Sequence, residues 1–557
     1  SGAEVMKYRF NWNFPVKFSI HDKNKLFAGS NFLHMTTDSG QSWKTISPDL
    51  TRGLPETIKS SGGPITQDNT GAEFYSNLFA INESPIEKGV IWVGSDDGLI
   101  HITTDNGETW KNVTPPPTLS PKLNMINCID PSPFKKGTAY VAATSYKFGD
   151  YKPYLYKTND YGKTWSLITK GIPQNYYSRA IRSDKVREGL LYAGTEWGMF
   201  ISFDDGKSWK PFQLNLPITS IRDLHIRDND LIAATHGRSF WMIDDLTPLH
   251  QLENNLNSQS FFLYKPDKAF RVDQSEVDDE TNFKLVGKNH PVGAILHFYI
   301  KDLKEDDLVS IEIKDKDGSL IKRYNNKAKP NNLNPEAELP LVLKSGGNKL
   351  IWDMRYPGYK EFEGMVFYSS PNKGPKAIPG EYLISLNYNG EVIEQSLKIE
   401  KDPRLENTDK DYRDQFDFLI NVRNQVTRAN SAIIKIREVQ KDLNYLKQKS
   451  GLTEEINNLI NQFENKLSII ENNIHMTKNQ SRQDPLNYGI RINNRIAFLL
   501  ADSQRGDYKP TDQSLEFFDS IVKELNKEEE SYKRILNTYT MQINNMILDN
   551  DIKFISF

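Results

Sequence analysis

Three carboxylates lie in short turns that follow apolar, strand-like runs of the sequence: Asp96, Asp97 and Glu196. Two carboxylates held roughly 5–9.5 Å apart can cleave a glycosidic bond, one as an acid and the other as a nucleophile or base. Asp-Asp-Gly and Glu-Trp-Gly are also ordinary turn sequences, because Asp and Gly favour tight turns. The sequence therefore assigns no catalytic residue outright, and Asp96, Asp97 and Glu196 are the candidates if the chain is a glycosidase.

Further residues suited to ligand contact occur in the same kind of turn. A Trp ring can stack on a sugar, and an Arg side chain can bind a carboxylate. His236 has no second His two to four residues away, which argues against a metal site. The sequence holds no Gly-rich phosphate loop, nucleophile elbow or Cys/His pair, so we expect neither a metal nor a cofactor. The predicted ligand-binding residues are Trp92, Asp96, Asp97, Glu196, Trp197, His236 and Arg238.

An octapeptide motif, Ser/Thr-x-Asp-x-Gly-x-Ser/Thr-Trp, occurs four times in the first half of the chain. An Asp two residues before a Gly suits a tight hairpin, because the carboxylate accepts backbone N–H bonds and Gly adopts positive φ without a Cβ clash. We assign these residues a structural role in the turn and no catalytic one. The Asp, Gly and Trp positions are Asp38, Gly40 and Trp43; Asp105, Gly107 and Trp110; Asp160, Gly162 and Trp165; and Asp204, Gly206 and Trp209.

The surroundings of the motif predict four-stranded antiparallel units. A short apolar run such as Ile91–Ser95, a turn and a second run precede the motif, and another strand begins at its Trp. The motif Asp residues are 67, 55 and 44 residues apart, and the shortest interval matches the period of roughly 40–50 residues of β-propeller blades. The motifs then lie on one face of the ring, whereas the turns between second and third strands lie on the opposite face, where ligands usually gather.

The predicted fold class is mainly β with an α-helical C-terminal region. Residues 1–255 are expected to form about five propeller blades, the last ending at Ala234–Asp245 without the motif. Residues 256–405 alternate in hydrophobicity and are expected to form an Ig-like β-sandwich. Residues 406–557 carry apolar stripes at three-four spacing and are expected to form an antiparallel helical bundle. Aromatic residues of the loop at 356–375, such as Phe362 and Phe367, are expected to dock onto a neighbouring domain.

The composition of the chain argues against nucleic acid and membrane as partners. The 557-residue chain has a net charge of −3 with acids and bases interspersed, which gives no reason to expect nucleic acid. No apolar run is long enough to span a membrane. The one cysteine, Cys128, is expected to be a buried strand thiol. The residues Tyr8–Phe14 look like the approach to a blade, so we expect a missing N-terminal part, or a second chain, to complete the ring.

The motif resembles the BNR or Asp-box repeat of sialidases, xyloglucanase-like glycosidases and sortilin-type (VPS10) propellers, and we call it the Asp box. The segments Gly62–Gly71, Gly94–His101 and Ala234–Trp241 are most similar to bacterial sortilin-like propeller proteins labelled as glycosyl hydrolases and common in Bacteroidota. The resemblance implies an exported protein, at the cell surface, in the periplasm or secreted. A sialidase would need a triad of arginines, for which Arg179, Arg182, Arg222 and Arg238 are available, but no Phe-Arg-Ile-Pro-like motif is present.

Three hypotheses for function follow. The first is a non-catalytic binding or scaffold protein of the cell envelope, whose propeller binds a peptide, a glycan or a partner protein. The second is a glycoside hydrolase of the xyloglucanase-like type that acts on a polysaccharide. The third is a subunit of an outer-membrane complex, which the expected incomplete ring favours.

Overall fold

The computed structural model describes residues 2–252, 258–272, 290–331, 333–449 and 452–549. The chain divides into two compact units, Ser1–Gln251 and Leu252–Phe557, which are described separately. The first is built from antiparallel sheets, and the second holds both further sheets and long helices. The fold is therefore mainly β with a C-terminal helical region, as the sequence predicts.

The first unit consists of five consecutive antiparallel meanders, which we call blades 1 to 5. In the first four blades the order of strands in the sheet is the order in the sequence, and the short fourth strand begins directly after the Asp-box Trp. Blade 1 is β1 (Val16–Phe18), β2 (Leu26–Gly29), β3 (Leu33–Thr36) and β4 (Lys44–Thr45); blade 2 is β7 (Leu78–Glu83), β8 (Ile91–Ser95), β9 (Ile100–Thr103) and β10 (Lys111–Asn112); blade 3 is β11 (Met125–Pro131), β12 (Ala139–Ser145), β13 (Asp150–Thr158) and β14 (Ser166–Leu167); blade 4 is β15 (Ser178–Ser183), β16 (Leu191–Thr195), β17 (Gly198–Ser202) and β18 (Lys210–Pro211); and blade 5 is β19 (Ile221–Arg227), β20 (Asp230–Thr235) and β21 (Phe240–Ile243).

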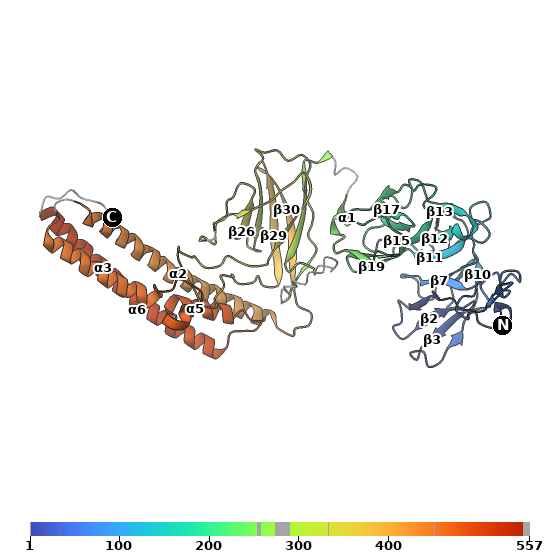
Figure 1. The fold of residues 1–557 in the computed structure, drawn as a ribbon, viewed down its shortest axis with the longest axis horizontal. Coiled ribbons are helices and arrows are strands. Elements are labelled where there is room, and N and C mark those ends of the chain that lie inside the picture. The colour runs from blue at the N-terminus through green and yellow to red at the C-terminus, as the bar shows by residue number, and fades with distance from the viewer. Residues whose placement is uncertain (1, 253–257, 273–289, 332, 450–451, 550–557) are drawn as a thin grey trace. The chain divides into compact units, whose positions relative to one another are not determined.

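The blades follow one another around an arc, from β2 and β3 through β7, β11 and β15 to β19 (Figure 1). The first strands of neighbouring blades contact each other in sequence order, β1 with β7, β7 with β11, β11 with β15 and β15 with β19. Consecutive meanders with their first strands on the inside have the arrangement of β-propeller blades. A small hairpin, β5 (Ser61–Gly62) and β6 (Gln67–Asp68), lies in the connection between blades 1 and 2, and α1 (Thr247–Gln251) ends the unit.

Burial differs between the middle and the end blades. Every residue of β8, β12, β16 and β17 is buried, because each middle blade packs apolar side chains against a blade on either side. Blade 1 buries Phe27 against blade 2 but exposes Val16 and Phe18, which point to its other face. Blade 5 buries Leu224 and Ile226 against blade 4 but exposes Phe240 and Met242. The arc therefore ends in two partly apolar faces that are open to solvent.

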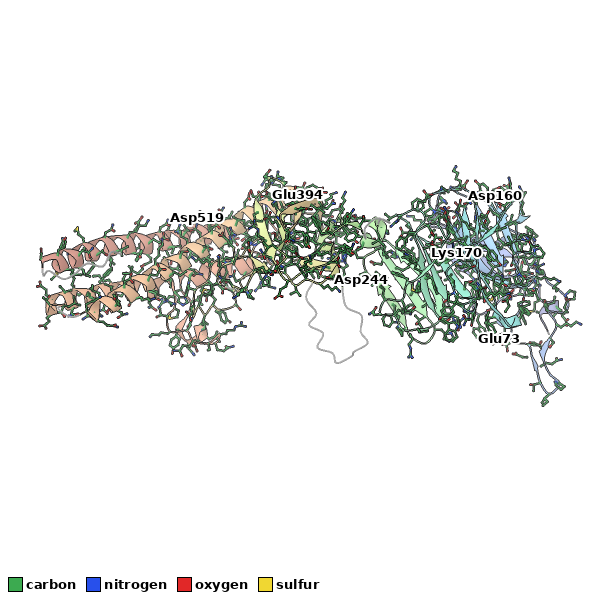
Figure 2. The ribbon with its side chains drawn as sticks, turned by 90° about the horizontal axis from the view of Figure 1, so that it is seen from above. Glu73, Asp160, Lys170, Asp244, Glu394 and Asp519 are labelled. Carbon is green, nitrogen blue, oxygen red and sulfur yellow. The ribbon has the colours of Figure 1, made fainter. Side chains whose placement is uncertain are left out.

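The four Asp boxes have the same hydrogen bonds. In the second box the Asp105 Oδ1 atom accepts from the Thr103 hydroxyl at 2.7 Å and from the Thr109 N–H at 2.9 Å, and Oδ2 accepts from the Thr109 hydroxyl at 2.5 Å. The Thr103 hydroxyl also accepts the N–H of Gly107, whose φ of +94° only a glycine adopts readily. The box at Asp160 lies at the edge of the unit (Figure 2). The Asp boxes are therefore turns in which the carboxylate accepts hydrogen bonds from residues of the same box.

The first part of the second unit has two sheets that share one hydrophobic core. The strand β24 alternates buried and half-buried residues along its whole length, because one face packs on the core and the other does not. The smaller sheet is β22 (Phe261–Leu263), β24 (Ala294–Ile300) and β28 (Gly346–Trp352); the larger is β23 (Ala269–Arg271), β30 (Glu391–Lys401), β29 (Gly380–Tyr388), β25 (Val309–Lys314), β26 (Leu320–Asn325) and β27 (Leu339–Pro340).

The helical part of this unit is α2 (Asp409–Lys447), α3 (Glu454–Ile474), α4 (Pro485–Tyr488), α5 (Ile492–Asp502) and α6 (Asp512–Asp549). Thr408 begins α2 with a capping box formed with Asp411, and the Thr453 hydroxyl begins α3 by accepting the Ile456 N–H. Phe362 of the loop after β28 is buried in the core of the helices, so the expected docking of this loop is confirmed for that residue. The buried Arg271 of β23 donates to Asp507, which ties the sheets to the helices in one unit.

The Trp of the Asp box is expected to stabilise the fold only where a carbonyl of a neighbouring blade accepts a hydrogen bond from its N–H. Trp165 is buried and donates to the carbonyl of Val113 in blade 2 at 2.7 Å, whereas Trp43 is 45% exposed and donates within its own box. Trp165→Phe should lower the free energy of unfolding by about 0.5–1.5 kcal/mol, because the half-buried Val113 carbonyl loses its donor. Trp43→Phe should cost less than about 0.5 kcal/mol.

Urea denaturation followed by tryptophan fluorescence measures both effects, since every tryptophan except Trp352 lies in the first unit. Equal losses for the two variants would contradict the role assigned to the contact between blades.

Candidate functional site

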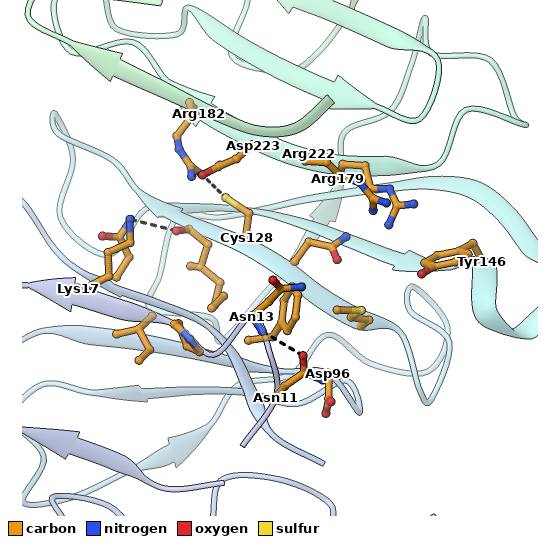
Figure 3. Close-up of a pocket in the computed structure, with 18 of the residues that line it drawn as sticks. Asn11, Asn13, Lys17, Asp96, Cys128, Tyr146, Arg179, Arg182, Arg222 and Asp223 are labelled. Atoms are coloured by element: carbon orange, nitrogen blue, oxygen red, sulfur yellow. Dashed lines mark hydrogen bonds and ion pairs between the residues drawn. The ribbon is translucent and has the colours of Figure 1, made fainter. Parts of the chain in front are cut away.

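A cavity of about 720 Å³ lies at the inner strands of the five blades. Each blade contributes through its first strand: Lys17 from blade 1, Asn82 from blade 2, Asn127 from blade 3, Arg179 from blade 4 and Arg222 from blade 5. Figure 3 shows these strands around the cavity, with Lys17 and Asn13 across from Arg182 and Arg222. The size is within the range of about 300–1,000 Å³ that is typical of ligand sites.

Amide side chains link the inner strands around the cavity. The Asn82 Nδ2 atom donates to the Ile129 carbonyl of the next blade at 3.1 Å, and the Asn127 Nδ2 atom donates to the Ser178 carbonyl at 3.3 Å. These bonds run from β7 to β11 and from β11 to β15, so they fix the spacing of the strands that line the cavity. The shape of the site is thereby set by the packing of the blades.

Arg179 is held by a carboxylate and two aromatic rings. Its Nε and Nη2 atoms lie 2.9 and 2.8 Å from Glu196 Oε2, and its guanidinium carbon lies 4.6 Å from the centre of the Tyr146 ring and 4.7 Å from that of Tyr177. The Ser220 hydroxyl also donates to Glu196 at 2.7 Å. Burial would raise the pKa of Glu196, but the bonds from Ser220 and Arg179 outweigh it and place the pKa below its usual value. Glu196 therefore orients an arginine and stays ionised.

Arg182 joins three blades. It donates to the sulfur of Cys128 in blade 3 and, through Nη2 at 2.6 Å, to Asp223 Oδ1 in blade 5. Burial acts to lower the pKa of Arg182, but the Cys128 sulfur and Asp223 act more strongly in the other direction, and the pKa is raised. Cys128 is a buried thiol of β11, as the sequence predicts. Arg182 is thus a permanent cation with a structural ion pair.

Three further cations at the cavity have no ion-pair partner among the residues that the structure describes: Lys17, Lys147 and Arg222. The Arg222 guanidinium donates to Nδ1 of His236 at 3.1 Å from Nε. Guanidinium groups form paired bonds with carboxylates, and ammonium groups act as point charges. This part of the cavity is therefore suited to an anion.

Asp96 lines the cavity from the turn after β8 and is buried. Its Oδ1 atom accepts the Asn77 N–H at 2.8 Å. Burial raises the pKa of Asp96 to about 7, with the neighbouring charge of Asp97 acting in the same direction and the Asn77 N–H and Lys147 opposing it. Asp96 is therefore partly protonated near neutral pH and is the one predicted carboxylate that the structure places in the cavity wall.

The remaining predicted site residues are placed elsewhere. Asp97 is buried and accepts from the Ser95 hydroxyl at 2.6 Å and the Arg52 N–H at 2.8 Å, so it anchors a loop. Trp92 is 1% exposed and packs edge-on against Trp165 in the core, which corrects the expectation that it meets a ligand. Trp197 and Arg238 are exposed turn residues outside the cavity lining, and His236 lies in it.

Three of the residues that sequence reasoning missed come from the first strands of the blades, and a fourth, Lys147, lies in the short 3-10 helix Tyr146–Phe148. Attention to the turns after the second strands passed over Lys17, Asn82, Asn127 and Lys147, and it named Arg179, Arg182 and Arg222 only for a sialidase triad. The structure brings those three arginines to one cavity and leaves Arg238 outside it. Asn127, Arg179 and Arg222 each occupy the irregular position of their first strand, but Phe79 holds that position in blade 2, so no polar repeat from blade to blade marked the lining in the sequence.

Within the residues described, no group of three or more His, Cys, Asp or Glu side chains is arranged to hold a metal ion. A search of the described helices for a long apolar stretch finds none that could cross a membrane.

The buried Asp96 should make the first unit less stable as the pH rises. A carboxyl with a higher pKa in the folded than in the unfolded state stabilises the fold below the unfolded value of about 3.9, and this contribution is lost as the pH rises through about 7. Asp96→Asn keeps an acceptor for the Asn77 N–H and removes the charge. It should raise the free energy of unfolding at pH 8 by about 1–3 kcal/mol and have little effect at pH 4.

Urea denaturation of both proteins at pH 4, 6 and 8 isolates this group, because all other titrations are shared. A variant less stable than the parent at pH 8 would show that the Asp96 charge is stabilised in the fold.

No protein-family model matches the sequence, and no curated protein matches it. Solved structures with similar sheets include a GH74 xyloglucanase from Xanthomonas campestris, at 16% identity and a TM-score of 0.31, over 41% of this chain and 35% of that one. YCF48 from Cyanidioschyzon merolae matches at 19% identity and a TM-score of 0.24, over 30% and 53%. The β-propeller domain of Cps50 (Swd1) from Myceliophteria thermophila matches at 12% identity and a TM-score of 0.28, over 43% and 67%. The chain thus spans about a third of the xyloglucanase and half of YCF48.

Proposed function

We propose that the chain is a non-catalytic binding protein whose cavity between the five blades holds an acidic group of a glycan or peptide. The observation that carries this proposal is the surplus of cations at the cavity. Five basic side chains face it, Lys17, Lys147, Arg179, Arg182 and Arg222, and two of them are neutralised by Glu196 and Asp223.

The surplus is local to the cavity. The whole chain carries a net charge of −3, so the basic side chains at the inner strands are not part of a generally basic surface. Asp96 is partly protonated near neutral pH and offsets them incompletely. Charges lining a cleft attract ligands of the opposite sign, and the attraction weakens as salt is added. A ligand with carboxylates suits both the charge and the geometry of the arginines.

The Tyr146 ring beside Arg179 lines the cavity and adds a surface for the rest of the ligand, and the buried Tyr177 supports it. The Tyr146 and Tyr177 rings are stacked with their centres 5.2 Å apart, and Tyr151, which is exposed, lies 5.9 Å from Tyr177. Aromatic faces of this kind pack on sugar rings and on apolar side chains alike. The Asn side chains at the inner strands supply hydrogen-bonding groups in the same cavity.

The alternative function, a glycoside hydrolase of the xyloglucanase-like type, meets a chemical difficulty. Both catalytic schemes need a protonated acid and a second, free carboxylate. Asp96 has the raised pKa of an acid, but Asp97 is bonded to Ser95 and the loop at Arg52, and Glu196 is bonded to Arg179 and Ser220. Asp96 would act alone, which favours binding over hydrolysis.

We further propose an extracytoplasmic location and a role in a larger envelope assembly, as the resemblance to sortilin-like Asp-box proteins implies. The open faces of blades 1 and 5 support the second part, because apolar side chains such as Phe18 and Phe240 stand exposed at both ends of the arc.

Binding is tested with the full chain by isothermal titration of trigalacturonate, an acidic peptide of similar charge and maltotriose. We expect an acidic ligand to bind and maltotriose not to bind. Arg222→Gln should weaken binding about tenfold or more, as expected for the loss of a charged hydrogen-bonding partner. Added salt should weaken binding as well.

Arg227→Gln is the matched control, because Arg227 lies on the same strand β19, is exposed and is absent from the cavity lining. Equal affinity for maltotriose, or equal loss in the two variants, would contradict an anion site. Release of reducing ends from a polysaccharide by the parent, abolished by Asp96→Ala, would establish the glycosidase instead.

A further inference from the structure

Three of the four Asp boxes contact the blade before them through one repeated bond. The Nε1 atoms of Trp110, Trp165 and Trp209 donate to the backbone carbonyls of Ile46, Val113 and Ile168, at 2.9, 2.7 and 2.6 Å. Each acceptor lies three residues after the Trp of the preceding box, at the end of the fourth strand. The acceptors are β-branched residues in all three cases.

The Gly of each box contacts the same residue of the preceding blade. A Cβ on Gly107 would lie 2.7 Å from the carbonyl oxygen of Ile46, and Cβ atoms on Gly162 and Gly206 would lie 2.6 and 2.7 Å from side-chain atoms of Val113 and Ile168. No larger residue fits there without a shift. Box Trp, box Gly and the residue at the end of the fourth strand therefore form one interface, repeated between blades 1 and 2, 2 and 3, and 3 and 4.

The Gly and Trp of the first box, Gly40 and Trp43, have no corresponding partner residue in the described part of the chain. Trp43 donates to the carbonyl of Gly40 in its own box at 3.1 Å, and a Cβ on Gly40 would meet only the Trp43 ring, at 3.8 Å. Phe18 on the same side of blade 1 is 71% exposed. The strand register puts Phe18 and Val16 on the face opposite Phe27, which packs on blade 2. The residues Tyr8 and Phe10 cover only the part of this face near His34.

Blade 5 of a second copy does not supply the missing half. Among the described residues it consists of β19, β20 and β21 without a fourth strand, and its sequence holds no Asp box. It therefore offers no residue three positions after a box Trp, although its outer face exposes Phe240 and Met242. The contact needs a sheet with four strands.

We propose that the outer face of blade 1, formed by Val16, Phe18, Gly40 and Trp43, binds one further four-stranded Asp-box sheet. The fourth strand of that sheet places a β-branched residue on Gly40 and its carbonyl accepts the Trp43 N–H. The proposal names the partner and the surface for the assembly role proposed above, and it rests on three copies of the same interface within the chain. The partner sheet is defined by this chemistry: four strands, an Asp box and a β-branched residue three positions after the box Trp.

Photocrosslinking in the cells that make the protein tests the interface. Phe18 is replaced by p-benzoylphenylalanine, an aromatic substitution at an exposed position, and the crosslinked peptides are identified by mass spectrometry. We expect adducts in an Asp-box sheet, at or next to the strand that follows its Trp. The matched control is the same replacement at Phe270, which is 38% exposed in the second unit and should give no such adduct.

The Trp43 bond is tested in the same cells. Trp43→Phe in the Phe18 photocrosslinking variant should lower the yield of the adduct about fivefold, the order expected for one lost hydrogen bond. Adducts within 221–243 of a second copy, adducts only in proteins without an Asp box, or no adduct would overturn the proposal. An unchanged yield with Trp43→Phe would remove Trp43 from the interface. The titrations of the isolated chain with acidic ligands are unaffected by these outcomes, so the two proposals fail separately.

Discussion

The carboxylate of the Asp box is the interaction on which the first unit depends. It accepts two hydroxyl donors and one backbone N–H in every copy, and these bonds close the turn before the fourth strand. The bonds hold the pKa of Asp38 and Asp105 at about 2, so the turns stay charged at any physiological pH. The closed turn fixes the direction of the Trp that follows. In three of the four boxes the Trp N–H then reaches the neighbouring blade, so a local turn sets the spacing between these sheets.

The sequence predicts these turns well because the interactions that make them are local. Asp105, Thr103 and Thr109 lie within seven residues, and their side chains bond to the backbone beside them. The strands follow from the turns, and the long helices follow from apolar stripes such as that of α3. The cysteine is found buried for the same simple reason, an apolar strand around it. Local pattern is enough for each of these elements.

The cavity could be predicted only in part, because its lining depends on contacts between blades. Trp92 looks like a ligand residue beside a turn, but both faces of β8 are buried, so alternation along that strand does not separate a ligand side from a core side. In the sequence, Glu196 and Asp97 look like free carboxylates. In the structure each accepts hydrogen bonds from a residue distant in sequence, Glu196 from Arg179 and Asp97 from Arg52. Lys17 and Arg222 are 205 positions apart in the sequence and meet at one cavity only because the blades form an arc.

The same geometry links the cavity to the outer faces of the arc. Each blade contributes its first strand to the cavity, and blades 1 to 3 also contribute the end of their fourth strand to the contact with the next Asp box. The angle between two of these blades therefore sets both. Blade 1 places Lys17 at the cavity and Trp43 at the open interface. A sheet bound at Trp43 would restrain blade 1 and with it the position of Lys17. By reciprocal linkage, an acidic ligand that binds better to the restrained arc would in turn favour the docking of that sheet.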